Sequence, residues 1–389
     1  MWMRNCWQVI AFANEIGPTP LARSVCNEPI VLFRTEAGEA VALADRCPHR
    51  FAPLSLGRVV GDQIQCGYHG LCFDRDGACV RVPGQDQVPA RARVRKYPLV
   101  ERYTFAWIWM GDAALADPAL VPDFHWMDDP AWACVPGYHH FAANYQLVND
   151  NLLDLSHESF VHEETIGNES VAESPASVTL HGDMVRVHRD MFDIEAPPFY
   201  KRTTGFVGRI NRWHTNHFTP PGFHVIENGS MPAQTRDKAQ ALERKVLNLI
   251  TPETTTTSHY FWGIVRQFRL DDRALDDAIR EGIVRTLRPG QGGAGGAAAR
   301  ARARPGQRGV PGLDSRRCRP DPGPQASGGD DRARSIGSGW RQRRTDEGFV
   351  VKKKSDFTAA SWPGLSRPST SSFDAPLKAR RGCPAQGRA

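Results

Sequence analysis

The chain has 389 residues, of which 40% are apolar and 24% are charged, and this composition excludes a peptide hormone, a collagen and a wholly disordered protein. The formal net charge is +6, but the residues after Leu287 contain 21 basic and 8 acidic side chains, which leaves 28 basic and 35 acidic side chains in residues 1–287. The basic excess therefore belongs to the C-terminal region, and we expect no nucleic-acid partner for the rest of the chain.

No apolar run approaches the roughly 18 residues that a membrane span requires. The longest run, at residues 105–110, has the length of a strand, and the N-terminal run at 7–12 is followed by polar residues without a cleavage site. We therefore expect a cytoplasmic protein that contacts no membrane. Nine cysteines are an odd number for a secreted disulfide framework, so free or metal-bound thiols are expected.

Residues 1–112 contain short strand-like stretches separated by turn signals, which predicts a small all-β domain. Strands are expected at residues 7–12, 30–34 and 104–110. A tight hairpin turn is expected at residues 74–77, where aspartate and glycine separate two short apolar stretches.

After a linker rich in proline, alanine and aspartate at residues 113–122, residues 123–287 mix strand-like stretches with helical patterns at 149–163 and 271–285. We predict an α+β domain with an antiparallel sheet and helices. Residues 288–389 are rich in glycine, alanine, arginine, proline and serine without a sustained apolar period, so we expect a disordered tail. The fold class is therefore α+β: a small all-β domain, an α+β domain and a tail.

Two short loops of the β domain each combine one cysteine and one histidine, at Cys47-Pro-His49 and Cys66-Gly-Tyr-His69. Zinc modules usually group their ligands as pairs of cysteines or pairs of histidines. A [2Fe-2S] centre, in which one iron takes two thiolates and the other two imidazoles, suits the mixed pairing better. The pattern therefore favours a two-iron cluster, with a structural zinc site as the alternative.

The residues around these ligands resemble the Rieske domain of the ring-hydroxylating oxygenases, through CPHRFAPLSLGR at residues 47–58 and QCGYHGLCFD at 65–74. The resemblance implies that the two cysteines bind one iron and the two histidines bind the other. Cys72 and Cys79 fall outside the pattern, and we expect them to be ordinary strand residues.

A second group, Asp154-x2-His157-x4-His162, lies within the predicted helix at 149–163. Two imidazoles and a carboxylate from elsewhere would form the facial triad of a mononuclear Fe(II) oxygenase, which leaves coordination positions open for O2 and substrate. On an ideal helix the two histidines lie about 140° apart. The helix must therefore bulge or end near residues 159–161 if both bind one ion.

The segment ANYQLVNDNLLDLSH at residues 143–157 resembles the catalytic domain of the vanillate O-demethylase oxygenase subunit and its demethylating relatives. Further motifs extend the resemblance over residues 1–286: GY at 137–138, NRW at 211–213, HFTPP at 217–221, TPE at 251–253 and HYFW at 259–262. The resemblance implies oxidative O-demethylation of a small aromatic methyl ether such as vanillate, with O2 as co-substrate and formaldehyde as a product.

The same resemblance implies an electron path and an assembly. A separate reductase with flavin and iron-sulfur centres passes electrons from NADH to the Rieske cluster, and the oxygenase subunit forms a homotrimer. Within the trimer, the cluster of one subunit serves the mononuclear iron of its neighbour, which His157 and His162 bind. Asp154 then hydrogen-bonds His69 of the adjacent chain and orients His157.

The resemblance also places the third iron ligand, an aspartate, in a late helix, and this residue is missing. The similarity stops at Thr286, and no acidic residue occurs between Glu281 and Asp314. Codons can be chosen for residues 289–300 that, read one base later, encode QDKAVLEAQQR, the helix of the family. We predict a one-base frameshift that removes the iron-binding aspartate at about Gly290; the alternative is a genuine low-complexity extension.

The loss would leave His157 and His162 as the iron ligands, unless one of the nearby acidic residues completes the site: Asp271, Asp272, Asp276, Asp277 or Glu281. A chain that binds the cluster but cannot oxygenate substrate is therefore the alternative to an active enzyme. The sequence does not identify the residues that contact substrate. Asn228 and His259 are candidates, and a structural role is the alternative for each.

Overall fold

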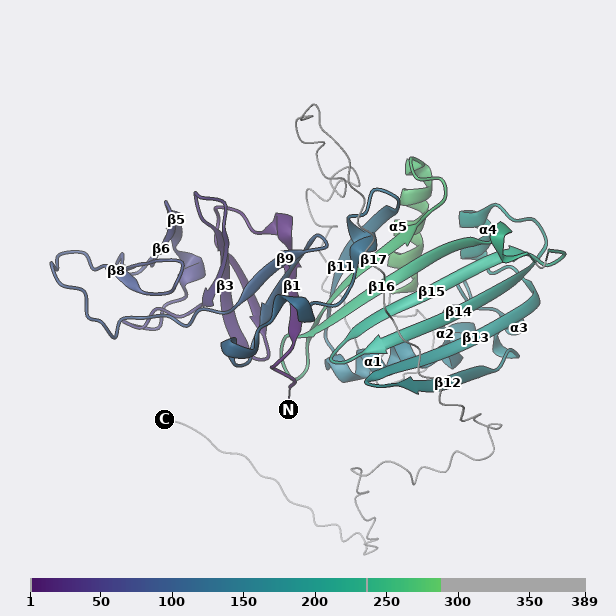
Figure 1. The fold of residues 1–389 in the computed structure, drawn as a ribbon, viewed down its shortest axis with the longest axis horizontal. Coiled ribbons are helices and arrows are strands. Elements are labelled where there is room, and N and C mark those ends of the chain that lie inside the picture. The colour runs from purple at the N-terminus through teal and green to yellow at the C-terminus, as the bar shows by residue number, and fades with distance from the viewer. Residues whose placement is uncertain (1, 236, 288–389) are drawn as a thin grey trace, which may run out of the picture. The chain divides into compact units, whose positions relative to one another are not determined.

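The computed structural model describes residues 2–235 and 237–287 (Figure 1). The predicted tail at residues 288–389, which includes the predicted frameshift segment, lies outside the described residues. Among the described residues, no helix is long and apolar enough to cross a membrane.

The first domain is built from three small antiparallel sheets. One sheet has the order β1-β10-β9, the second β2-β3-β4 and the third β5-β6-β7-β8. The elements are β1 Trp7–Phe12, η1 Ala13–Glu15, β2 Leu21–Val25, β3 Glu28–Arg34, β4 Ala40–Ala44, η2 Leu54–Leu56, β5 Arg58–Val60, β6 Gln63–Gln65, β7 Cys72–Phe73, β8 Cys79–Arg81, β9 Leu99–Arg102 and β10 Phe105–Trp109. The strands predicted near residues 7–12, 30–34 and 104–110 are confirmed, and the predicted turn joins β7 to β8.

The second domain is one seven-stranded antiparallel sheet in the order β11-β17-β16-β15-β14-β13-β12, with helices packed against one face. The strands are β11 Ala133–Phe141, β12 Ala176–His181, β13 Met184–Glu195, β14 Arg209–Thr219, β15 Phe223–Pro232, β16 Leu242–Pro252 and β17 Ser258–Arg266. The helices are η5 His125–Met127, α1 Tyr145–Leu153, η6 Leu155–His157, α2 Glu158–Val161, α3 Glu169–Ala172, α4 Pro198–Thr204, η7 Lys238–Gln240 and α5 Arg273–Thr286. The predicted α+β architecture is therefore confirmed.

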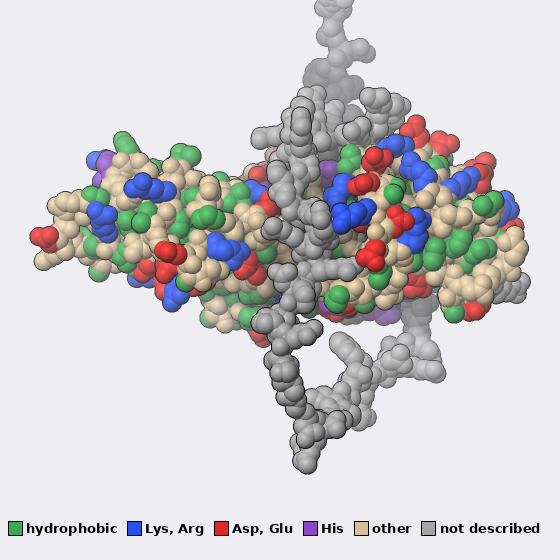
Figure 2. Space-filling model, turned by 90° about the horizontal axis from the view of Figure 1, so that it is seen from above, with side chains coloured by type: hydrophobic (Ala, Val, Ile, Leu, Met, Phe, Trp, Pro, Cys, Tyr) green, Lys and Arg blue, Asp and Glu red, His purple; other side chains and the backbone are tan. Residues whose placement is uncertain are grey.

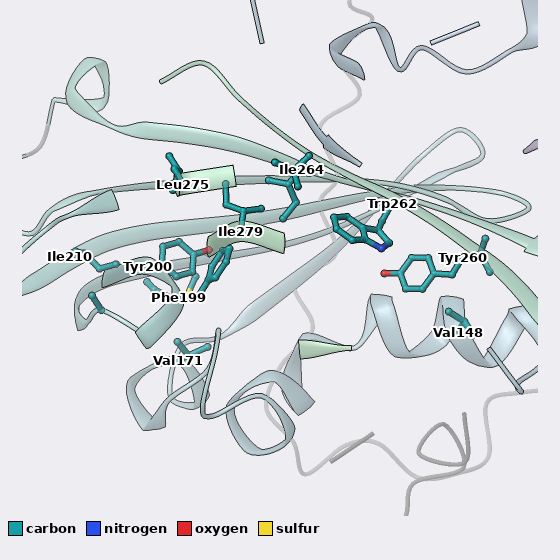
Figure 3. Packing of buried hydrophobic residues seen from close by; sticks show 14 of the residues in the cluster. Val148, Val171, Phe199, Tyr200, Ile210, Tyr260, Trp262, Ile264, Leu275 and Ile279 are labelled. Carbon is teal, nitrogen blue, oxygen red and sulfur yellow. The ribbon is translucent and has the colours of Figure 1, made fainter. Parts of the chain in front are cut away.

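Successive side chains of a strand point to opposite faces of the sheet, and this alternation divides the residues of β14 to β17 into two groups. The even-numbered group packs against the helices in a hydrophobic cluster, in which Tyr260, Trp262 and Ile264 meet Phe199 and Ile279 (Figure 3). The odd-numbered group faces residues of the first domain: Phe223, Leu247, Leu249, Phe261 and Val265. β17, in the part of the sheet that the first domain and the helices both cover, is therefore buried on both faces.

The two domains share a hydrophobic core, because β1 and β10 of the first domain pack against the odd-numbered face of the sheet. The ring centroids of Phe12, Phe105 and Phe261 lie 5.2–6.3 Å apart. A buried hydrogen bond of 2.7 Å from Thr251 Oγ1 to the carbonyl of Val9 crosses the same boundary. The domains are therefore not independent modules.

The predicted linker at residues 113–122 contains two short 3-10 helices, η3 Ala113–Leu115 and η4 Pro118–Leu120. Asp112 and Asp117 cap them, since each carboxylate accepts a hydrogen bond from the N–H two residues later. The indole of Trp7 donates to the carbonyl of Asp117 at 2.8 Å and so fastens the segment to β1.

Charges of both signs are mixed on the surface of the second domain. Figure 2 shows Lys and Arg side chains beside Asp and Glu side chains over the visible face. Exposed pairs such as Lys201–Glu195 and Arg209–Asp193 join them at 2.8 Å. The mixture is consistent with the near balance of 28 basic and 35 acidic residues over residues 1–287, which include this domain.

We predict that Phe261→Ala destabilises both domains together. Phe261 is fully buried between Phe12 and Phe105, and truncation of such a side chain costs about 3–5 kcal/mol. Urea unfolding, followed by far-UV circular dichroism and by tryptophan fluorescence, should show one transition at a lower midpoint. Val178→Ala on β12, where the side chain is exposed, is the control and should leave the midpoint unchanged. Two separate transitions in the Phe261 variant would contradict a shared core.

Candidate metal centres and cavity

The loops that carry Cys47 and Cys66 are built in the same way. Each cysteine carbonyl accepts a hydrogen bond from the N–H of the fourth residue after it, at 2.9 Å from Phe51 and at 3.0 Å from Gly70. Both donor residues have positive φ, 59° and 73°, so the chain turns back sharply. Each loop thereby presents one cysteine and one histidine.

The four predicted cluster ligands form two pairs that differ in exposure. Cys47 and Cys66 are buried, at 2% exposure each, whereas His49 and His69 are exposed with ring centroids 4.6 Å apart. Burial, together with the neighbouring Cys66 thiol, raises the pKa of Cys47 to about 11, so the metal-free thiol keeps its proton. An inner pair of thiols and an outer pair of imidazoles fit a [2Fe-2S] centre whose histidine-bound iron faces outward.

The residues beside the two loops support them. A Cβ atom at Gly67 would lie 2.7 Å from the carbonyl oxygen of Leu56, so only glycine allows the loops to approach this closely. Cys72 and Cys79 are buried on β7 and β8, as predicted for strand residues, and the thiol of Cys72 donates to the carbonyl of Gly70 at 3.5 Å.

The segment predicted as one helix at residues 149–163 is broken at Asp154. α1 ends one residue before it, η6 follows, and α2 ends at Val161, where the ligand pattern required an end. The Asp154 carboxylate accepts hydrogen bonds from the N–H (2.8 Å) and the hydroxyl (2.6 Å) of Ser156 and so caps the new turn. The additional break at Asp154 was not predicted; it occurs because a capping aspartate competes with helical hydrogen bonds.

The break places His157 and His162 together at the wall of one cavity, with ring centroids 5.1 Å apart. His157 Nδ1 donates to the main-chain carbonyl of Asp154, which leaves Nε2 for a metal. Burial, together with nearby His157, lowers the pKa of His162 to about 4. This imidazole is therefore neutral near pH 7, as a metal ligand must be.

The group that orients His157 is the carbonyl of Asp154 and not its carboxylate. The carboxylate bonds to Ser156 and belongs to an exposed residue. Asp154 therefore orients His157 as expected of this residue, but through its main-chain carbonyl and not through its carboxylate. The exposed carboxylate is accessible to a second chain, and its bond to His69 of an adjacent subunit stays a prediction.

A cavity of about 120 Å³ extends from the two histidines along the helix-covered face of the sheet. Because of the alternation, its sheet lining consists of even-numbered residues of β14 to β17. The polar ones are Arg212, His214, Asn228, Arg244, Asn248, Tyr260 and Trp262. Apolar and aromatic walls with a few polar groups are typical of a site for a small molecule.

Several buried side-chain nitrogens at the cavity have no partner among the described residues: Arg212 Nε, His214 Nε2, Arg244 Nη2, Asn248 Nδ2 and Trp262 Nε1. A buried donor without an acceptor costs about 1–3 kcal/mol, so the cavity suits a ligand with acceptor atoms. Within residues 2–235 and 237–287, Glu158 is the only carboxylate that lines the cavity, and it pairs with Arg212 at 3.9 Å. Arg244 is then an excess positive charge.

None of the five acidic residues near α5 lines the cavity. Asp272 caps α5 and pairs with Arg269, and Asp276 forms an ion pair with Arg266 at 2.6 Å. In the described part of the chain, no three His, Cys, Asp or Glu side chains converge to hold a metal ion. Position 290, where the sequence places the missing aspartate, lies outside the described residues.

Of the two candidates for substrate contact, Asn228 lines the cavity, and its side-chain oxygen accepts a hydrogen bond of 3.2 Å from the Tyr200 hydroxyl. His259 has an odd number and lies on the opposite face of the sheet. Its ring nitrogens bond to the Tyr138 hydroxyl and to the carbonyl of Ser24, at 2.9 Å each, which is a structural role.

Sequence reasoning did not single out four polar residues of the cavity as site residues: Glu158, Arg212, His214 and Arg244. The signal in the sequence is a basic residue in phase with buried positions of a strand, as at Arg244 two residues before Val246. Without the register of the sheet, such a side chain could equally face solvent.

This chain is similar to known proteins in both domains. Residues 6–98 match the Rieske [2Fe-2S] domain, and residues 141–288 match the vanillate O-demethylase oxygenase C-terminal domain. The iron-sulfur subunit of the toluene-4-sulfonate monooxygenase system of Comamonas testosteroni is 41% identical over 73% of this chain and 84% of its own length. A vanillate O-demethylase oxygenase subunit of Pseudomonas sp. strain HR199 is 40% identical over 72% of this chain and 82% of its own length.

Solved structures are similar as well. A crystal structure of dicamba monooxygenase bound to 3,6-dichlorosalicylic acid has a TM-score of 0.70 and 35% identity, covering 73% of this chain and 84% of that one. A structure of dicamba monooxygenase with non-heme iron and dicamba has a TM-score of 0.61 and 33% identity, covering 72% and 85%. The match to the Rieske [2Fe-2S] domain identifies a Rieske-type [2Fe-2S] cluster as a cofactor.

We predict that Cys66→Ser abolishes the cluster, whereas Cys72→Ser does not. Both residues are buried, but Cys66 lies on a loop with a histidine and Cys72 lies on a strand. A serine hydroxyl is far less readily deprotonated than a thiol and is a poor replacement ligand for iron. Visible absorbance and acid-labile sulfide of the purified protein should be lost in the first variant only. Their loss in Cys72→Ser at unchanged far-UV circular dichroism would contradict the ligand assignment.

Proposed function

Because this chain belongs to the Rieske non-haem iron oxygenases of the vanillate O-demethylase type, we propose that it is an oxygenase component that demethylates a small aromatic methyl ether. Vanillate is the leading substrate, with protocatechuate and formaldehyde as products. The observation that carries the proposal is a single cavity lined by both candidate iron ligands, His157 and His162, and by buried donors suited to an aromatic acid.

When bound, the cluster supplies single electrons and the mononuclear iron supplies the site of O2 activation. Cys47, Cys66, His49 and His69 would hold the cluster, and His157 and His162 the mononuclear iron. The other residues of the cavity exclude water and orient the substrate. Aromatic side chains such as Phe199 and Trp262 form walls against which an aromatic ring can pack.

The charge of the cavity favours a substrate with an anionic group. Arg244 is buried, its Nη1 donates to Thr203 Oγ1 at 2.8 Å, and its guanidinium lies over the Tyr200 ring at 4.2 Å. Nη2 has no partner, and no carboxylate of the described residues forms an ion pair with this arginine. A carboxylate on the aromatic ring would accept from Nη2 and leave the methyl group toward the histidines.

Oxygenation of an aromatic sulfonate is a second candidate function. A sulfonate offers the same negative charge and acceptor oxygens as a carboxylate, so the donors around Arg244 suit both. Toluene-4-sulfonate, the compound that appears in the name of one relative, is the corresponding test compound. The two candidates differ in product, because only a methyl ether releases formaldehyde.

We expect two protein partners. A reductase with flavin and iron-sulfur centres would pass electrons from NADH to the cluster. A homotrimer would let the exposed carboxylate of Asp154 bond to His69 of the partner subunit and so connect the cluster of one subunit with the iron of another. Phe160 and Val161 support a subunit contact near Asp154, since both side chains are apolar and are 76% and 60% exposed.

Metal content and turnover separate an active enzyme from the cluster-binding but inactive alternative. About three irons and two acid-labile sulfides per chain, with formaldehyde release from vanillate when a suitable reductase is present, would mean that another carboxylate completes the iron site and that the enzyme is active. Two irons, two sulfides and no formaldehyde would mean that the carboxylate ligand is absent.

Resequencing the gene beyond the codon of Leu287 tests the frameshift. Codons that do not encode the family helix when they are read one base later would exclude it.

We predict that Arg244→Gln weakens vanillate binding about 10- to 100-fold, because a hydrogen bond to a charged group contributes about 1.5–3 kcal/mol. Isothermal titration calorimetry measures this without turnover. Lys245→Gln is the control, since it removes the same charge from the next residue of β16, which pairs with Glu227 away from the cavity. Guaiacol, which lacks the carboxylate, should bind the wild type and both variants equally; an equal loss for guaiacol would contradict charge recognition.

A further inference from the structure

We propose that Glu158 is a positioning residue for the mononuclear iron, a role that rests on the proposed function in so far as His157 and His162 bind that iron. Glu158 follows His157 directly and begins α2, and its side chain is only 6% exposed. A carboxylate is almost never buried unless other groups compensate its charge. The partners of this carboxylate therefore identify what it does.

Two residues of strand β14 hold the Glu158 carboxylate. Oε1 lies 3.4 Å from Nδ1 of His214, and Oε2 lies 3.9 Å from Nη2 of Arg212. Both partners are buried, at 5% and 2% exposure. Burial lowers the pKa of His214 to about 4, so its ring is neutral near pH 7 and the charged contact is the one with Arg212. This buried ion pair, which water screens little, attaches the start of α2 to the sheet.

The same arginine also holds the far end of the segment. Arg212 Nη1 donates to the carbonyl of Ile166 at 3.0 Å, and its guanidinium lies over the Tyr200 ring at 4.3 Å. Residues 158–166, which include His162, are therefore fastened at both ends to one guanidinium.

Main-chain contacts close the segment between these two points. The carbonyl of His162 accepts hydrogen bonds from three successive N–H groups at 2.9–3.0 Å: Thr165, Ile166 and Gly167. Gly167 approaches Glu158 so closely that a Cβ atom would lie 2.1 Å from the Glu158 carbonyl oxygen. A closed segment moves as a unit, so the attachment to β14 sets the place of His162 relative to His157.

The geometry distinguishes positioning from direct ligation. The Glu158 carboxylate is engaged with β14, and no group of three potential ligands converges within the described residues. Without the negative charge, Arg212 would lose its carboxylate partner and the segment its charged attachment. Groups that orient metal ligands typically change metal affinity 10- to 100-fold when they are altered.

The test uses the full chain with its cluster in place and Co(II) as the probe of the second site. Glu158→Gln keeps the shape of the side chain and removes its charge. Glu164→Gln is the matched control, because Glu164 belongs to the same segment but is exposed. We expect Co(II) affinity to fall 10- to 100-fold and the visible Co(II) spectrum to change in the first variant only, with the absorbance of the Rieske cluster unchanged in both.

Arg212→Gln extends the test to the partner of the carboxylate. We expect it to weaken Co(II) binding similarly, and the double variant to lose little more than either single variant, since both remove one contact. If Glu158→Gln loses the cluster and so fails to fold, Glu158→Asp replaces it; this variant keeps the charge but shortens the side chain, and we expect an intermediate loss of Co(II) affinity.

Three results would overturn the proposal. In the first, Glu158→Gln binds Co(II) as tightly as the wild type does. In the second, Glu158→Gln loses all Co(II) binding but Arg212→Gln does not, which would make Glu158 a ligand. In the third, the wild type binds no Co(II). The proposed oxygenase function is decided separately, by formaldehyde release from the wild type. A wild type that turns over while Glu158→Gln binds Co(II) normally would reject only the positioning role.

Discussion

The alternation of side chains in the seven-stranded sheet is the constraint on which the rest of the structure depends. Odd-numbered apolar residues of β15 to β17 face the first domain, whereas even-numbered residues of β14 to β17 carry the polar groups of the cavity. β17 shows the result, because all nine of its residues are buried. A register slip of one residue in β16 would move Arg244 into the aromatic core, so the cavity and the shared core fix each other.

The sequence predicted best what depends on residues close together in the chain. The cluster ligands lie in two short loops, and strands such as 7–12 follow from local alternation. Within the helical segment at 149–163, the break at Asp154 was missed because the pattern did not show that this residue would cap a new turn. The charged residues of the cavity could not be predicted for another reason. Arg244 lines the cavity only because β16 pairs with its neighbouring strands in one register, which the sequence does not show.

The two metal centres differ in how far the protein prepares them. At the second centre, the carbonyl of Asp154 selects the tautomer of His157, and burial keeps His162 neutral, so the imidazoles are ready to bind. At the first centre, the pKa of Cys47 is raised by burial and by the adjacent thiol. Cluster assembly must therefore release the proton of the Cys47 thiol, whereas His162 is already neutral near pH 7.

The core shared by β1, β10 and the sheet limits how such a chain can diversify. In a chimaera of two related chains joined at residues 113–122, the odd-numbered face of the sheet from one protein would pack against β1 and β10 from the other. The packing mismatch would affect aromatic side chains such as Phe12, Phe105 and Phe261. Exchange of even-numbered residues leaves that contact intact. Inherited changes of specificity can therefore accumulate on one face of the sheet while the electron-carrying domain stays compatible with its reductase.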